Sequence, residues 1–175
     1  MSSGKIIFLN GVSSSGKSSL AMALQQRLEE PFLHFQLDAF IEMLPWLGDD
    51  ALFMEMVSGM HCAMAAMSND GLNLIVDHVL IEKEWLDQCL DLLADRYVLF
   101  MGLNCDLEEL ERRERQRDNR RQGFARAQLP KIHKDKVYDL ELYTCRMNVQ
   151  ACADRILEFY RSHQPTAFNT MRHAS

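Results

Sequence analysis

The sequence lacks any long hydrophobic run. None of its stretches approaches the roughly 20 consecutive apolar residues that a membrane-spanning helix needs. The apolar segment near the start of the chain, residues 6–9, is also too short for the core of a secretory signal peptide. We therefore expect a protein without a membrane partner and with a cytoplasmic location.

Signals of cysteine pairing are also missing. The five cysteines are odd in number, and no two of them stand in a C-x-x-C pair. This spacing disfavours both a disulfide framework and a zinc site. We expect the cysteines to be buried, reduced thiols. They are Cys62, Cys89, Cys105, Cys145 and Cys152.

An excess of basic residues is absent too. The 175-residue chain has 19 Lys and Arg against 25 Asp and Glu, which gives a formal net charge of -6. Because an acidic chain gains little from the release of counterions, we expect no nucleic-acid partner. The hydrophobic fraction of 47% is high enough for one globular core and excludes disorder as the main state.

Strand patterns alternate with helix patterns along most of the chain. Short apolar runs predict five strands, at residues 5–10, 32–37, 72–76, 97–103 and 138–143. Helical patterns lie between and after them, from Lys17 to Pro31 and at residues 49–68, 82–93, 107–121 and 147–161. This order is typical of an α/β fold with an open, mainly parallel sheet flanked by helices. We expect a single domain at residues 1–163 and a flexible C-terminal tail at 164–175, where the chain is polar and irregular.

A phosphate-binding loop directly follows the first predicted strand. Residues 11–18 match the Walker A pattern G-x-x-x-x-G-K-[ST], with a strand before it and a helix after it. Its backbone N–H groups can surround phosphates, Lys17 can reach the β- and γ-phosphates, and the Ser18 hydroxyl can bind Mg²⁺. The sequence thus predicts a P-loop NTPase domain that binds ATP and Mg²⁺, and it leaves the preference for ATP over GTP open. The expected nucleotide-binding residues here are Gly11, Val12, Ser13, Ser14, Ser15, Gly16, Lys17, Ser18 and Ser19.

Two aspartates are placed at the ends of predicted strands. In an open parallel sheet, ligands bind beyond the carboxyl ends of the strands. We assign Asp77 to Mg²⁺ binding together with Ser18, because it ends an apolar strand as a Walker B aspartate does. We assign Asp38 to the role of catalytic base toward an acceptor hydroxyl. The alternative for either carboxylate is to cap the helix that follows it.

Arginines are concentrated in one segment. Seven lie between Arg112 and Arg126, and the spacing of Arg113, Arg117 and Arg120 places them on one helical face. Small kinases close a basic lid over the triphosphate after the fourth strand, so we expect an Arg-rich lid here. In it, Arg113 and Arg117 act with Lys17 in catalysis, and Arg120 contacts the nucleotide. The alternatives are a solvated helix with Glu–Arg pairs at spacing four and an RNA-binding patch, but the arginine run at residues 112–121 lacks interleaved aromatic residues for base stacking.

Two further patterns have both a structural and a functional interpretation. Met56, Met60, Met64 and Met67 lie along one helical face, which is typical of a core stripe but also suits an apolar wall around an acceptor. His78 directly follows Asp77 and is either a structural histidine or a residue that orients the acceptor.

Several segments resemble the chloramphenicol phosphotransferase family of small P-loop kinases, which are similar to shikimate and adenylylsulfate kinases. The matching segments are residues 7–11, 13–18, 37–45, 75–79, 102–106 and 133–141, with Arg113, Arg117 and Arg120. The resemblance implies that the γ-phosphoryl group of ATP is transferred to a hydroxyl of a small molecule. It also implies that Asp38 is the base and that Arg113 and Arg117 belong to the lid.

The sequence leaves the acceptor open. We expect an O-phosphotransferase similar to chloramphenicol 3-O-phosphotransferase, although only residues 46–50 separate Pro45 from the next helix, fewer than in the family pattern. The alternatives are a nucleotide-sugar, nucleoside or sugar kinase on the same fold, and a regulatory nucleotide-binding module without kinase activity. The oligomeric state is also left open.

Overall fold

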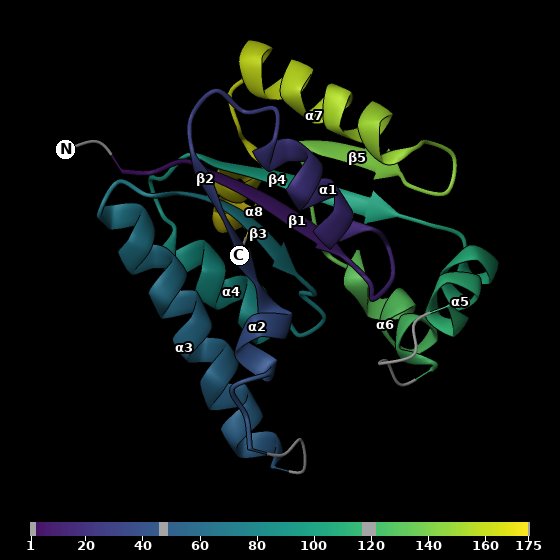
Figure 1. Cartoon of the computed structure of the whole chain (residues 1–175). Coiled ribbons are helices and arrows are strands. Elements are labelled where there is room, and N and C mark those ends of the chain that lie inside the picture. The colour runs from purple at the N-terminus through teal and green to yellow at the C-terminus, as the bar shows by residue number, and fades with distance from the viewer. Residues whose placement is uncertain (1–2, 46–48, 117–121, 175) are drawn as a thin grey trace.

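Five parallel strands lie side by side in the order β2-β3-β1-β4-β5 (Figure 1). In this computed structural model the described residues are 3–45, 49–116 and 122–174. All five predicted strands are present, and their bounds are β1 Ile6–Gly11, β2 Phe32–Gln36, β3 Asn73–His78, β4 Val98–Asn104 and β5 Leu140–Tyr143. The order of the strands reverses next to β1, because the chain passes from β1 out to β2 and returns through β3. In α/β sheets such a switch point is where ligands bind.

Both faces of the sheet are covered by helices, and the strand residues alternate between the two faces. Ile6 and Phe8 of β1 contribute to one core cluster, whereas Ile7 and Leu9 contribute to the other. This alternation follows from the two-residue period of a strand, and a strand buried on both faces is apolar throughout. The first cluster packs against α3 (Asp50–Asn69), α4 (Lys83–Leu92) and α8 (Ala167–Ala174), and the second against α1 (Lys17–Gln25) and α7 (Val149–Ser162).

A third, smaller core lies beyond the carboxyl ends of the strands. Helices α5 (Leu107–Arg115) and α6 (Phe124–Ile132) pack on each other there, next to the loop that follows β1 (Figure 1). Val12 of that loop belongs to the same buried cluster as Leu110 of α5 and Ala125 of α6. The two helices are therefore packed directly against the predicted phosphate loop.

The expectation of a flexible C-terminal tail is wrong for residues 167–174. They form α8, in which Ala167, Phe168 and Met171 are buried in the first core cluster. Asp139, just before β5, accepts hydrogen bonds from the N–H groups of Thr166 and Ala167, at 2.7 and 3.0 Å. The start of α8 is thus stabilised by a distant carboxylate, which no local pattern in the tail reveals.

Other differences concern element boundaries and two helices that the sequence did not predict. Helix α2 (Leu37–Ile41) follows β2 directly, so Asp38 lies in the first turn of a helix and not at the end of a strand. Helix α6 occupies the polar stretch before β5. The expected helix at 107–121 is present up to Arg115, and its remainder at 117–121 lies outside the described residues.

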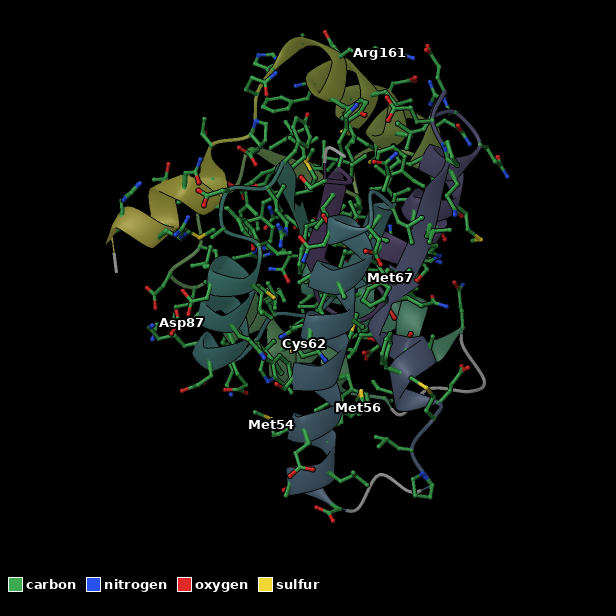
Figure 2. The ribbon with its side chains drawn as sticks, turned by 90° about the vertical axis from the view of Figure 1, so that its left-hand side faces the viewer. Met54, Met56, Cys62, Met67, Asp87 and Arg161 are labelled. Atoms are coloured by element: carbon green, nitrogen blue, oxygen red, sulfur yellow. The ribbon has the colours of Figure 1, made fainter. Side chains whose placement is uncertain are left out.

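The methionine stripe of α3 is a core stripe. Met60 and Met64 are fully buried, and Met56 and Met67 pack against the same cluster. Figure 2 shows the outer side of α3, where Met54 and Cys62 are exposed. The expectation of buried thiols is therefore wrong for Cys62, while Cys89, Cys105 and Cys152 are buried, and all five cysteines are free. None of the helices that the structure describes is long and apolar enough to cross a membrane.

Candidate active site

The loop between β1 and α1 forms the centre of the site. Ser14 and Gly16 both have positive φ angles, 63° and 96°. Such left-handed positions turn successive backbone N–H groups toward one point, which makes a concave nest for an anion. Gly11 begins the loop where space is tight, because a Cβ there would lie 2.7 Å from the Ser15 hydroxyl. The loop leads into the N-terminus of α1, whose dipole also favours an anion, so this geometry suits a polyphosphate.

Lys17 lies at the mouth of this loop. Its Nζ donates hydrogen bonds of 3.0 Å to the carbonyl oxygens of Gly11 and Val12, and it lies 3.7 Å from Asp77 Oδ1. The residue is only 7% exposed. A buried ammonium held by carbonyls and a carboxylate is positioned to exchange part of these contacts for phosphate oxygens.

Asp77 lies within β3, opposite Leu9 of β1 and Gln36 of β2, and not one residue beyond the strand as predicted. The Ser18 hydroxyl donates a hydrogen bond of 2.6 Å to Asp77 Oδ2. His34, on β2, has its Nε2 3.5 Å from the same oxygen. Burial alone would raise the pKa of Asp77, but the Lys17 ammonium, the adjacent His34 ring and the hydrogen bond from Ser18 outweigh it, so its pKa is lowered.

The Ser18 and Asp77 oxygens fit a Mg²⁺ ion that is bound together with a nucleotide. Mg²⁺ prefers oxygen ligands and in kinase sites takes one or two protein ligands beside phosphates and water. The hydroxyl and the ionised carboxylate are adjacent and lie next to the phosphate loop. A cluster of three or more His, Cys, Asp or Glu side chains with metal-binding geometry does not occur among the residues described. The two oxygens therefore suit a metal that is held mainly by its substrate.

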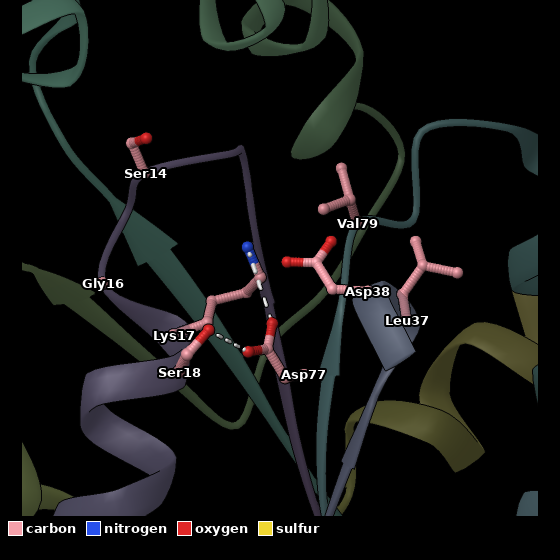
Figure 3. A pocket seen from close by; sticks show the side chains of 8 residues that line it. All are labelled: Ser14, Gly16, Lys17, Ser18, Leu37, Asp38, Asp77 and Val79. Carbon is pink, nitrogen blue, oxygen red and sulfur yellow. Dashed lines mark hydrogen bonds and ion pairs between the residues drawn. The ribbon is translucent and has the colours of Figure 1, made fainter. Parts of the chain in front are cut away.

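Asp38 faces the phosphate loop across a small cavity. Figure 3 shows its carboxylate pointing from α2 toward Lys17, over the space that Asp77 and Ser18 line from below. Leu37 and Val79 form the apolar part of the lining. The structure thus brings Asp38, Lys17 and Asp77 together around one cavity. The N-cap of α2 is Gln36, and Asp38 lies in the first turn of this helix. The role of Asp38 as base stays a prediction.

Arg113 is the described lid arginine that lies against the phosphate loop. Its guanidinium donates to the backbone oxygen of Thr144 at 2.9 Å and to that of Ser14 at 3.4 Å, while its Nε donates to Glu109 at 2.8 Å. The sequence anticipated the pair with Glu109 but not the contacts with Thr144. Arg113 is therefore fixed beside the loop by groups from three separate segments.

Two other described arginines of the segment form ion pairs on the surface. Arg112 pairs with Glu109, and Arg126 pairs with Glu111, both on the exposed side of α5 and α6. These pairs agree with the interpretation of a solvated, salt-bridged helix. The predicted lid residues Arg117 and Arg120 lie outside the residues that the structure describes, so their roles stay predictions.

A second cleft opens beside the phosphate loop on the side of α7. It has a volume of about 440 Å³ and begins at Ser14, Gly16 and Ser19 of the loop region. Its far wall comes from the segment between β5 and α7 and from the start of α7. The lining there consists of Thr144, Met147, Asn148, Val149 and Cys152, with Arg113 and Gln116 at the edge. A mainly apolar wall with a few polar groups next to a phosphate site suits the base and ribose of a nucleotide.

His78 does not face the cavity at Asp38. It is fully buried on the opposite face of the sheet, where its Nε2 lies 3.0 Å from His61 Nε2. The structural interpretation of this histidine therefore holds. Asn10 has a similar supporting role: its side chain donates to Ile132 O and Tyr138 Oη and accepts from the N–H of Leu80. These bonds connect β1 to α6 and to the segment after β3.

Comparisons with known proteins agree with this geometry. A "Putative O-phosphotransferase Rv2636" of Mycobacterium tuberculosis is 32% identical to this chain, over 98% of the chain and 89% of that protein. Among solved structures, the M. tuberculosis APS kinase CysC in complex with AMPPNP and APS has a TM-score of 0.74 at 18% identity, covering 93% of this chain and 100% of that one. Shikimate kinase from Acinetobacter baumannii in complex with shikimate has a TM-score of 0.64 at 16% identity, covering 91% and 94%.

The two solved structures show the fold, because their sequence identities are low. The family is shown by the sequence itself. The family described as Chloramphenicol phosphotransferase-like protein matches residues 4–161, which include the phosphate loop, both aspartates and the arginine segment. This chain therefore belongs to the chloramphenicol phosphotransferase-like family.

Proposed function

We propose that this small-molecule kinase transfers the γ-phosphoryl group of ATP to a hydroxyl group of a small acceptor. The observation that carries the proposal is the position of Asp38, whose carboxylate shares one cavity with Lys17 and the phosphate loop. A base on one side and a phosphate site on the other are what an in-line transfer to an alcohol requires. The relative named above as a putative O-phosphotransferase and the fold shared with an APS kinase and a shikimate kinase support the proposal.

Each described site residue has a separate task in this reaction. The loop N–H groups hold the phosphates, and Lys17 neutralises the charge that develops between the β- and γ-phosphates. The acceptor oxygen attacks the γ-phosphorus, its proton passes to the Asp38 carboxylate, and the bond from the γ-phosphorus to the oxygen of the leaving ADP breaks. Arg113 stabilises the closed phosphate loop and adds positive charge beside it.

Ser18 and Asp77 would hold Mg²⁺ in the nucleotide complex. When bound, the ion supplies charge neutralisation at the β- and γ-phosphate oxygens. The low pKa of Asp77 keeps the carboxylate ionised and ready for this task at neutral pH. Without the ion, Asp77 orients the Ser18 hydroxyl and the Lys17 ammonium toward the loop.

The acceptor side is built from α2 and the start of α3. Phe40 and Ile41 of α2 and Phe53 of α3 are half-buried, and they border the segment that carries Asp38. The segment directly after Pro45, at residues 46–48, lies outside the described residues. We therefore propose a small acceptor and leave chloramphenicol as one member of a test panel.

The decisive experiment measures ADP formation from ATP with Mg²⁺ across a panel of hydroxylated compounds. The panel includes chloramphenicol, shikimate-like cyclic alcohols, sugars, nucleosides and nucleotide sugars. Acceptor-dependent ADP formation, with the phosphorylated product detected by mass spectrometry, is expected for at least one class. ATP use that no small alcohol stimulates and that a protein partner does stimulate would instead show a regulatory nucleotide-binding module.

A further inference from the structure

One contact connects the phosphate loop to a helix that the sequence did not predict. The backbone N–H of Ser13 donates a hydrogen bond of 2.7 Å to the side-chain oxygen Oε1 of Gln128, on α6. Because a backbone N–H can only donate, the amide atom that faces it is the oxygen. The Gln128 side chain of α6 therefore already accepts from one of the N–H donors of the anion-binding nest.

Gln128 is held in this place by the packing of its helix. The carboxylate of Glu114 accepts hydrogen bonds from the N–H groups of Gly123 and Ala125, at 3.0 and 2.8 Å, and so fixes the start of α6. At the other end, the Asn10 side chain donates to Ile132 O at 3.1 Å. Glu114 and Asn10 are both buried. Because these bonds fix both ends of α6, the position of Gln128 against the loop does not depend on the exposed arginines.

The Ser13 N–H belongs to the end of the loop where the γ-phosphoryl group arrives. In such loops the lysine reaches the β- and γ-phosphates. Here the Nζ of Lys17 donates a hydrogen bond to the carbonyl oxygen of Val12, the residue before Ser13. The N–H groups nearer to α1 face the inner phosphates. A bound triphosphate therefore competes with Gln128 for the Ser13 N–H.

The amide of glutamine can serve both states. It has an oxygen that accepts and an NH₂ group that donates, on one freely rotating terminal bond. When a phosphate oxygen takes the Ser13 N–H, a half-turn of this bond exchanges the oxygen for the NH₂ group. The donor then points at the anion.

We propose that Gln128 is a catalytic residue that donates a hydrogen bond from its amide NH₂ to the transferred γ-phosphoryl group. This inference rests on the proposed kinase function and assigns it an additional contact from α6. In the structure the same side chain accepts from the Ser13 N–H and so connects α6 to the loop.

The test uses Gln128→Glu, which retains an acceptor for the Ser13 N–H and replaces the NH₂ donor by a negatively charged oxygen. Without nucleotide, its melting temperature is expected to equal that of the wild type. Affinity for a non-hydrolysable ATP analogue with Mg²⁺ should fall by about 10-fold or more, and affinity for ADP by much less, because only ATP brings the γ-phosphate against this charge. Calorimetric titration measures both affinities.

Gln122→Glu is the matched control, since it adds the same charge at an exposed position just before α6. It should bind both nucleotides as the wild type does. Gln128→Ala adds a second criterion: loss of a phosphoryl donor should lower kcat by about 10-fold or more. An unchanged kcat together with tighter ATP binding by Gln128→Ala would show that Gln128 only competes with the nucleotide for the Ser13 N–H, and would overturn the proposal.

The outcomes separate this inference from the proposed function. If the wild type binds no ATP analogue, the kinase function fails, and this inference fails with it. If the wild type binds the analogue and Gln128→Glu binds it equally well, only the role of Gln128 is wrong.

Discussion

The proposed chemistry depends on one carboxylate, that of Asp38. Replacement of Asp38 by Asn keeps the shape of the side chain but removes the group that accepts the proton of the acceptor hydroxyl. We expect the affinity for ATP to stay within about 3-fold of the wild type and kcat to fall by about 10²- to 10⁴-fold. Titration with a non-hydrolysable ATP analogue and an ADP-release assay with the identified acceptor measure the two quantities.

Glu42→Gln provides the control for this experiment. It neutralises another acidic residue at the end of α2, on an exposed side chain. Its turnover should equal that of the wild type. Unchanged turnover in Asp38→Asn would remove Asp38 from the role of base.

Adjacent arginines allow a second test at the level of single residues. Arg113 contacts Ser14 and Thr144, whereas its neighbour Arg112 contacts Glu109 on the exposed side of α5. Arg113→Ala should raise KM for ATP by about 10-fold or more, because it removes charge-assisted bonds beside the phosphate loop. Arg112→Ala should leave KM for ATP unchanged. Equal effects of both variants in steady-state kinetics would show that general surface charge, not the position of Arg113, is responsible.

The last helix of the chain shows how secondary structure elements depend on distant partners. Phe168 of α8 packs on Phe8 and Phe100 of the sheet, with ring centroids 6.1 and 5.2 Å away. Phe168→Ala should lower the free energy of unfolding by about 3–5 kcal/mol, as for other buried aromatic residues. Urea unfolding followed by circular dichroism measures this loss.

Phe124→Ala is the comparison, since this phenylalanine of α6 is 45% exposed. It should change the unfolding free energy by less than about 0.5 kcal/mol. A Phe168→Ala variant as stable as Phe124→Ala would mean that α8 does not contribute to the core.

Helices α6 and α8 share the reason why their sequences did not reveal them. Each begins next to a carboxylate from elsewhere in the chain: Glu114 accepts from the start of α6, and Asp139 from the start of α8. Both helices are short, and α6 contains Pro130, so that the local helical signal is weak. Helices α3, α4 and α7 were predictable because their apolar residues recur with helical spacing.

For the molecule as a whole, a buried histidine pair makes stability depend on pH. His61 Nδ1 donates to Gln88 Oε1 at 2.7 Å, so its Nε2 accepts from His78 Nε2 at 3.0 Å, and both rings are neutral. Burial lowers the pKa of His61, and burial followed by repulsion from His61 and Lys17 lowers the pKa of His78 to about 3. In the unfolded chain both rings titrate near pH 6.5.

The folded chain therefore binds fewer protons than the unfolded chain between pH 6.5 and the lowered pKa values. The free energy of unfolding should fall as the pH drops below 6.5, by up to about 1.4 kcal/mol per pH unit for each histidine. Urea unfolding of the nucleotide-free protein at pH 7.0, 6.0 and 5.0 checks this.

A variant identifies the source of the pH dependence. His61→Gln removes one of the two groups and should reduce the slope, whereas His173→Gln changes an exposed histidine of α8 and should leave it unchanged. If the slope is the same in all three proteins, the acid sensitivity comes from other groups.

The sequence by itself determined the five strands and the phosphate loop, and it placed both aspartates near one edge of the sheet, although Asp38 lies in the first turn of α2 and Asp77 lies within β3. These features depend on neighbouring residues: alternation makes a strand, and glycines at fixed spacing make a loop with inward N–H groups. The tertiary structure decided which side chains meet at that loop. Arg113 and Gln128 contact the loop itself, His34 approaches Asp77, and Thr144 accepts a hydrogen bond from Arg113, although the four residues come from different elements or loops. Such contacts join residues far apart in the chain, and their position depends on the packing of whole helices, which no local pattern encodes.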